Sequence, residues 1–155
     1  MRTPIREFTL ERVRTLDAAL RVLRDSPGTV PLAGCTDVYV ALEFGGRPGT
    51  RYLDLTPLAS LRRITTRGDV LVIGALASYT DLQRSRLVRA RLPMLVEAAR
   101  LVGGVQIQNM GTVGGNLVAD DTTGGPNHLC NSTIGGSVIS PGELVQLVLG
   151  HWLCL

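Results

Sequence analysis

The chain of 155 residues contains no lysine, so all sixteen of its basic residues are arginines. Aromatic residues are also scarce, since the sequence holds one Trp, three Tyr and two Phe. Nucleic-acid-binding proteins combine a basic footprint with aromatic side chains on which bases stack. The arginines here are spread over residues 2–100, so we expect no nucleic-acid partner despite the net charge of +3.

Cysteine is rare, and Cys35, Cys130 and Cys154 form no CxxC pair. An odd number of unpaired cysteines favours a reducing compartment, which here means the cytoplasm, over a disulfide framework. His128 is close to Cys130, but no second cluster completes a four-ligand set, so we expect no metal centre. The first ten residues lack the apolar segment of a signal peptide, and no apolar run approaches the ~20 residues of a membrane span.

Hydrophobic residues make up 45% of the chain and charged residues 19%, which is typical of a folded protein. Helices are predicted over residues 16–24, 37–44, 78–84 and 93–102. Strands are predicted over residues 29–32, 51–55, 61–65, 70–73 and 105–108, with a hairpin turn at 67–69. Residues 122–155 carry one charged side chain, Glu143, and are broken by glycine and proline. They are interpreted either as a Gly-rich surface segment with a final helix over 143–155 or as a part that no longer continues the domain.

Two turns of similar composition follow two of the predicted strands. The first is Ala33-Gly34-Cys35-Thr36-Asp37, and the second is Gly111-Thr112-Val113-Gly114-Gly115-Asn116. Glycine lets main-chain N–H groups approach a phosphate with unusual φ angles, and threonine adds a hydroxyl donor. Asp37 is expected to cap the following helix, whose N-terminus would then face the ligand. The pattern favours an extended phosphate-bearing cofactor, although Gly-Gly turns also occur simply as helix ends and hairpins.

Other nucleotide motifs are missing. A P-loop needs a lysine, and the chain has none. No GxGxxG opens a helix, which argues against a dinucleotide site of the Rossmann type, and no GxSxG indicates a hydrolase.

At these residues the chain resembles the FAD-binding subunit of the molybdenum hydroxylases, the xanthine dehydrogenase and carbon monoxide dehydrogenase family. The family's AGGTD loop is similar to residues 33–37, its IDL to 53–55 and its IGA to 73–75. The family pattern LPxLxEAA followed by QIRNxGTIGGN is similar to residues 92–99 and 106–116. The resemblance runs in order over about residues 5–120.

The resemblance implies an α+β fold of the two-lobed PCMH type, with FAD held between the lobes and the second lobe incomplete. We expect an N-terminal lobe over residues 1–55, the start of the second lobe over 56–121 and a divergent or non-native tail over 122–155. The cofactor-binding residues implied are Pro31, Leu32, Ala33, Gly34, Cys35, Thr36, Asp37, Val38, Val102, Gly111, Thr112, Val113, Gly114, Gly115 and Asn116. No catalytic residue is expected, because the flavin carries the chemistry.

The implied function is electron transfer within a molybdopterin-dependent hydroxylase. FAD would receive electrons from a [2Fe–2S] small subunit, fed by a molybdopterin-binding large subunit, and pass them to NAD⁺ or another acceptor. The alternatives are another PCMH-type flavoprotein and a degenerate, non-catalytic fragment. Against the first, residues 33–37 contain no histidine of the kind through which the oxidases attach flavin, and residues 122–155 show no sign of the reductases' catalytic Ser and Glu.

Two departures from the family pattern affect the expected site. Cys35 stands where the family often has glycine, which is tolerable if φ is negative there, and its thiol would be an oxidation site beside a flavin. Gly125 stands where the family has an aspartate, for which Asp120 or Asp121 is a possible substitute. Asp81 and Glu97 are interpreted as solvated helix charges, Asp54 as a turn brace and His128 as a loop residue.

Overall fold

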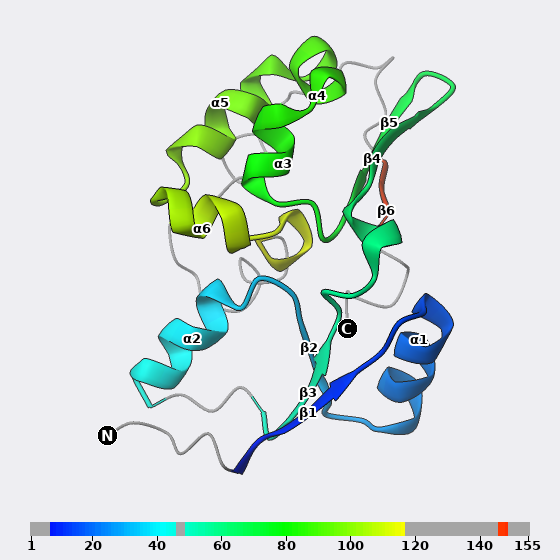
Figure 1. Cartoon of the computed structure of the whole chain (residues 1–155), viewed down its shortest axis with the longest axis vertical. Coiled ribbons are helices and arrows are strands. Elements are labelled where there is room, and N and C mark those ends of the chain that lie inside the picture. Colours follow the sequence, from blue (N-terminus) through cyan, green and yellow to red (C-terminus); the bar gives the residue numbers. More distant parts are fainter. Residues whose placement is uncertain (1–6, 46–48, 117–145, 149–155) are drawn as a thin grey trace. The chain divides into compact units, whose positions relative to one another are not determined.

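The computed structural model describes residues 7–45 and 49–116 and the backbone of residues 146–148. The chain divides into two compact units, Met1–Ala59 and Ser60–Leu155, each with its own sheet and helices (Figure 1). Both units mix helices with strands, which confirms the predicted α+β class. The division falls after Ala59.

The first unit contains a parallel sheet of three strands in the order β1-β3-β2. The strands and helices of this unit are β1 Thr9–Arg12, α1 Leu16–Asp25, β2 Val30–Leu32, α2 Thr36–Glu43 and β3 Arg51–Asp54. The central strand β3 is buried at Tyr52, Leu53 and Asp54, while all four residues of the edge strand β1 are exposed. Parallel neighbours require crossover connections, and α1 and α2 provide them.

Helix α1 begins directly after its N-cap residue, Thr15. The Thr15 hydroxyl accepts a hydrogen bond from the N–H of Ala18 at 3.2 Å, and Asp17 places a negative charge in the first turn. Both features stabilise a helix N-terminus. The helix ends at Ser26, immediately before the Pro-Gly pair, so the predicted span of 16–24 is confirmed within one residue.

In its described part, the second unit pairs a hairpin with the four helices α3 to α6. Its elements are η2 Ala59–Arg62, β4 Ile64–Arg67, β5 Val70–Gly74, α3 Tyr79–Arg84, α4 Arg86–Arg91, α5 Pro93–Leu101, α6 Val105–Met110 and β6 Gln146–Val148. Strands β4 and β5 are antiparallel, and Gly68 adopts a φ of +58° in the turn that joins them. Strand β6 pairs in parallel with β5.

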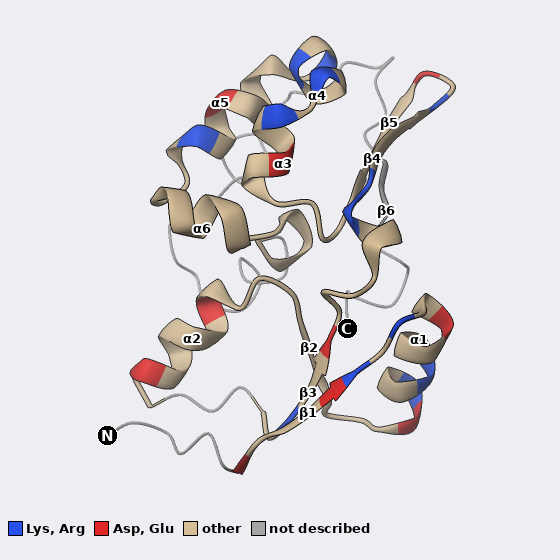
Figure 2. Ribbon diagram, in the orientation of Figure 1, with Lys and Arg blue, Asp and Glu red and all other residues tan. Residues whose placement is uncertain are grey.

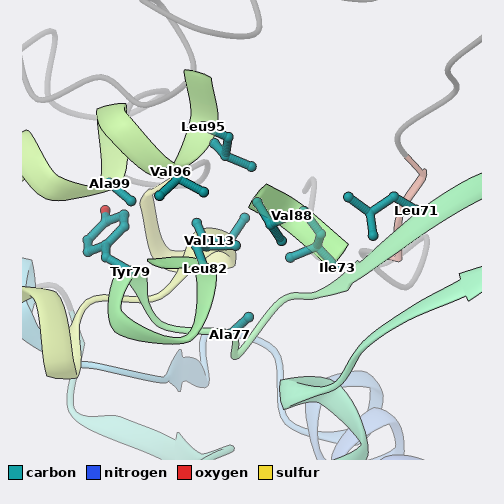
Figure 3. Close-up of a cluster of buried hydrophobic side chains, with 10 residues drawn as sticks. All are labelled: Leu71, Ile73, Ala77, Tyr79, Leu82, Val88, Leu95, Val96, Ala99 and Val113. Carbon is teal, nitrogen blue, oxygen red and sulfur yellow. The ribbon is translucent and has the colours of Figure 1, made fainter. Parts of the chain in front are cut away.

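The core of the second unit lies where α3, α4 and α5 pack on β5 (Figure 3). Ten side chains are buried there: Leu71, Ile73, Ala77, Tyr79, Leu82, Val88, Leu95, Val96, Ala99 and Val113. The inner face of α5 is apolar, since Leu95, Val96 and Ala99 all belong to this cluster and Val102 packs against it. Pro93 is at the first position of α5, where its missing N–H costs nothing.

Three predictions of secondary structure were wrong. Residues 105–108 form helix α6 instead of a strand, because their alternating pattern does not bury either face and α6 contains no buried residue. The first strand of the hairpin begins at Ile64 and not at residue 61, since Leu61 lies in the 3-10 turn η2. Of the final apolar segment, the described part is the strand β6 and not a helix.

Candidate functional site

The first turn leads from β2 into α2. Cys35 is the N-cap residue of α2 and adopts a left-handed conformation with φ 60° and ψ 10°. Its carbonyl oxygen accepts the first helical hydrogen bond, from the N–H of Tyr39 at 3.0 Å. Among the described residues, no side chain caps this helix. The chain therefore reverses direction through Cys35 and starts α2 with its first N–H groups unsatisfied by a cap.

The expected capping role of Asp37 is wrong. Asp37 lies inside the first turn of α2 and is exposed, and its carboxylate accepts a hydrogen bond from the Thr36 hydroxyl at 3.2 Å. The helix begins one residue earlier than predicted because Cys35 takes the left-handed conformation that ends the preceding loop. A negative charge in the first turn still interacts favourably with the helix dipole.

Cys35 was expected to be tolerated in place of glycine only with a negative φ, and it does not have one in the structure. Its φ is positive, and it is the one non-glycine residue with a positive φ in the described part of the chain. This conformation favours glycine, the residue that the family often has here. Burial of the thiol raises its pKa, and the negative charge of Asp54 raises it further. Because the thiolate is the reactive form, both effects protect Cys35 from oxidation.

The first turn keeps main-chain donors available. Residues Thr36, Asp37 and Val38 precede the first complete helical hydrogen bond, and their N–H groups have no acceptor among the described residues. Such N–H groups at the start of a helix bind phosphate and other anions. The first turn therefore fits the pyrophosphate of a dinucleotide.

The second turn is built differently. Thr112 caps a short helical turn over 113–116, where its hydroxyl oxygen accepts a hydrogen bond from the N–H of Gly115 at 3.1 Å. The N–H groups of Val113 and Gly114 donate to the carbonyl oxygens of Ala77 and Ala75, at 2.9 and 2.8 Å. The turn is thus fastened along the segment that connects β5 with α3.

The glycines of the second turn are explained by close packing and not by unusual φ angles. None of the positive φ values found in the described residues belongs to Gly111, Gly114 or Gly115. A Cβ on Gly114 would lie 2.9 Å from both the Cβ and the carbonyl oxygen of Ala75, and one on Gly111 would lie 2.6 Å from the ring of Tyr79. The expectation that these glycines provide unusual backbone angles is therefore wrong.

The second turn consequently retains few donors for a ligand. The N–H groups of Gly111, Val113, Gly114 and Gly115 all donate within the chain. The N–H of Thr112 has no acceptor among the described residues. The second turn therefore offers a ligand a packed, buried backbone with one free N–H group, whereas the first turn offers the N–H groups of three successive residues.

Roles were predicted for three further acidic residues; the prediction for Asp81 is wrong, and those for Asp54 and Glu97 agree with the structure. Asp81 was expected to be solvated, yet it caps α3 through Ser78 and pairs with Arg62, whose Nε lies 2.7 Å from Oδ2. Asp54 braces a turn as expected, accepting hydrogen bonds from the N–H and the hydroxyl of Thr56 at 2.9 and 2.6 Å. Glu97 is exposed and pairs only along its own helix, with Arg100.

Sequence reasoning missed an amide network that holds α6. The side-chain amide of Gln108 donates to the carbonyl oxygens of Arg100 and Gly103 at 2.9 and 3.3 Å. The amide of Gln83 donates to Gln108 and to the carbonyl oxygen of Ala99. The carbonyl groups at the end of α5 thereby receive hydrogen bonds from side-chain amides. The same bonds hold α6, which immediately precedes the second turn in the chain.

The structure places the predicted site residues in two groups. Residues 31–38 lie in the first unit, and residues 111–116 lie in the second, where they contact 75–78. Val102 ends α5 and is half-buried against the core of the second unit. Asp120, Asp121, Gly125, His128 and Cys130 lie outside the described residues.

In the described part of the chain no helix is long and apolar enough to cross a membrane.

Comparison with known proteins identifies the same region. A family model described as "FAD binding domain in molybdopterin dehydrogenase" matches residues 6–141. The glyceraldehyde dehydrogenase medium chain of Sulfolobus acidocaldarius is 33% identical over 111 residues, which are 72% of this chain and 40% of the relative. The xanthine dehydrogenase FAD-binding subunit of Escherichia coli O157:H7 is 37% identical over 107 residues, which are 68% of this chain and 37% of the relative.

A solved structure shows the same fold. Carbon monoxide dehydrogenase from Hydrogenophaga pseudoflava matches with a TM-score of 0.71 and 30% identity, over 76% of this chain and 41% of that chain. The chain thus spans about two-fifths of the length of the relatives it matches.

The fold, the two turns and these matches define a class of two-lobed α+β flavoproteins, with the second lobe incomplete in this chain. Within that class, the chain belongs to the family of FAD-binding domains in molybdopterin dehydrogenases. FAD is the cofactor of this family, and its members are parts of oxidoreductases.

Proposed function

We propose that this chain holds FAD in a molybdopterin-dependent hydroxylase or dehydrogenase of the cytoplasm. Its partners would be a [2Fe–2S] small subunit and a molybdopterin-binding large subunit, and the electrons would leave for NAD⁺ or another acceptor. The observation that carries the proposal is the uncapped start of α2 within the loop that resembles the family's AGGTD. The names of the relatives, a medium chain and an FAD-binding subunit, support the multi-subunit arrangement.

The chain's own contribution is to bind and orient the cofactor. FAD, when bound, supplies electron acceptance and donation, so no acid or base from this chain is needed. In our proposal the N–H groups of Thr36, Asp37 and Val38 donate to the phosphate oxygens. This set of donors is preformed, because α2 needs no rearrangement to present them.

The second turn would act mainly by shape. Its backbone is fixed by hydrogen bonds to Ala75 and Ala77, so it presents a rigid surface that cannot collapse into the space of the cofactor. Thr112 adds one free N–H, and its hydroxyl, which accepts from Gly115, still has a proton to donate. Val102 and Asn116 belong to this wall in our proposal.

Position 35 offers a matched pair of variants that tests the phosphate site. Asparagine and aspartate both tolerate the left-handed conformation, so Cys35→Asn and Cys35→Asp should fold alike and differ only in charge. A carboxylate beside a pyrophosphate is repelled, and at an effective dielectric constant of about 20 this costs a few kcal/mol. We expect Cys35→Asp to lose FAD affinity at least ~10-fold relative to Cys35→Asn, since a factor of ten is about 1.4 kcal/mol.

The measurement is the visible absorption of each purified chain after FAD has been added and the excess removed, followed by titration for affinity. The wild-type chain and Cys35→Asn should keep a flavin band at near one flavin per chain. Equal affinities of the two variants would show that the first turn is not the phosphate site. A folded wild-type chain without flavin would refute the proposed function and favour the alternative of a degenerate fragment.

A further inference from the structure

A basic segment of the second unit is not used by the proposed cofactor site. Residues 82–96 contain four arginines and no aspartate or glutamate. Figure 2 shows these basic residues along α4 and at the end of α3. They are Arg84, Arg86, Arg89 and Arg91.

The packing of α4 directs this charge outward. Val88 is fully buried in the core of the second unit, which fixes the inner face of the helix. Arg86 is exposed on the opposite face, with Arg89 one turn further along. Arg84, just before α4, is also exposed.

No carboxylate of the described residues forms an ion pair with any of these four guanidinium groups. Two of the groups are nevertheless held in place. Arg89 donates to the carbonyl oxygen of Gln83 at 2.9 Å, and Arg91 donates to that of Asp69 at 2.6 Å. An arginine that is already oriented loses less conformational entropy when it binds a carboxylate.

Two exposed apolar side chains lie in the same segment. Leu87 on α4 is 37% exposed, and Met94 at the start of α5 is 59% exposed. Arginine and methionine are both enriched in protein–protein interfaces relative to the rest of the surface. A membrane-bound helix needs a broad apolar face, but α4 has six residues and turns Val88 inward.

We propose that the surface formed by Arg84, Arg86, Leu87, Arg89 and Met94 is a docking site for an acidic protein surface. The occupant we assign is a partner subunit of the molybdopterin-dependent assembly, so this inference rests on the proposed function. Complementary charge would set the orientation of docking and its dependence on salt, and the partner would cover Leu87 and Met94.

The absence of lysine allows a site-specific test. Arg86→Lys keeps the charge and adds a single side-chain amine, which a water-soluble carbodiimide joins only to a carboxylate in direct contact. The matched control is Arg21→Lys, at an exposed position of α1 in the first unit. Each full-length chain is produced with a tag in the organism that carries it, purified with its associated subunits and cross-linked, and the linked peptides are identified by mass spectrometry.

We expect the Arg86→Lys amine to link to an aspartate or glutamate of a subunit that carries a [2Fe–2S] cluster or molybdopterin, and the Arg21→Lys amine to give no such link. The link should weaken at least several-fold when the salt concentration rises from 50 to 500 mM, which shortens the Debye length from about 14 to about 4 Å.

Three results of the cross-linking would overturn the inference: no associated subunit, equal linking from both variants, or a link to a second copy of this chain. Binding to phosphatidylglycerol vesicles is measured for the wild type and for Arg86→Glu. Vesicle binding by the wild type but not by Arg86→Glu, without a subunit link, would also overturn it. Flavin absorbance is recorded on every variant. Bound flavin without a link refutes the docking surface alone, whereas a link without flavin refutes the proposed cofactor role alone.

Discussion

Replacing Gly114 by alanine tests whether the second turn is a ligand cradle or a packed structural element. In the structure, the added methyl group would meet the Cβ and the carbonyl oxygen of Ala75 at 2.9 Å and its Cα at 3.3 Å. These are atoms of the backbone and of the first side-chain carbon, so they cannot turn away as the end of a flexible side chain would. The clash can be relieved only by moving the second turn away from residues 75–77.

The expected cost follows from two effects. Forcing a methyl group into a well-packed site typically costs about 1–3 kcal/mol. Moving the turn also weakens the hydrogen bond from the Gly114 N–H to Ala75, now 2.8 Å long, which is worth about 1 kcal/mol. We therefore expect a loss of roughly 2–4 kcal/mol, or a decrease in Tm of roughly 5–15 °C for a chain of this size.

The neighbouring glycine supplies the control. A methyl group on Gly115 would approach only the hydroxyl oxygen of Thr112, at 3.0 Å, and alanine is favoured over glycine in a helix by about 1 kcal/mol. Gly115→Ala should therefore stay within about 1 kcal/mol of wild type. Thermal and urea unfolding followed by circular dichroism would measure both variants.

The result that would refute this reasoning is equal stability of Gly114→Ala and Gly115→Ala. If Gly114→Ala kept wild-type stability and lost only flavin, the glycine would serve the ligand directly, as the sequence alone indicated. A loss of stability without any FAD present would show that Gly114 is required by the fold.

Two further predictions concern polar contacts in the second unit. Gln108→Leu should leave the exposed carbonyl groups of Arg100 and Gly103 without their donor and cost about 0.5–1.5 kcal/mol. It should also speed hydrogen exchange in α6 but not in α1, and unchanged exchange would contradict the prediction. Burial raises the pKa of Asp81, but hydrogen bonds from Arg62 and Ser78 outweigh it and hold the pKa below its usual value. The Asp81 carboxylate stabilises the fold above its unfolded pKa of about 3.9, and this stabilisation is lost as pH falls through the folded pKa. Asp81→Asn should therefore make the free energy of unfolding fall less steeply as pH is lowered. An unchanged dependence of that free energy on pH would contradict this.

Local signals in the sequence predicted the elements whose causes are local. The helices predicted over 16–24, 78–84 and 93–102 begin at Leu16, Tyr79 and Pro93. The caps Thr15 and Ser78 and the first-turn Pro93 act on neighbours within about four residues. The hairpin around Gly68 was found for the same reason. In each case one residue type satisfies a backbone requirement that its immediate neighbours create.

Two of the errors come from side-chain hydrogen bonds to other elements of the fold. Residues 105–108 alternate between apolar and amide side chains, which is typical of a strand, but the amide of Gln108 is bound to the end of α5 and the segment is helical. Asp81 seemed solvated because its partner, Arg62, is nineteen residues away. No short-range pattern contains this information.

The two turns show how similar composition can serve different physical needs. In the first, Cys35 carries the unfavourable left-handed conformation, and the N–H groups that follow are left free. In the second, the glycines allow close contact with Ala75 and Tyr79, and nearly every N–H is already used. The affinity for a phosphate-bearing cofactor should therefore depend on charge at the first turn and on packing at the second, so changes at Cys35 should act on binding and changes at Gly114 on folding.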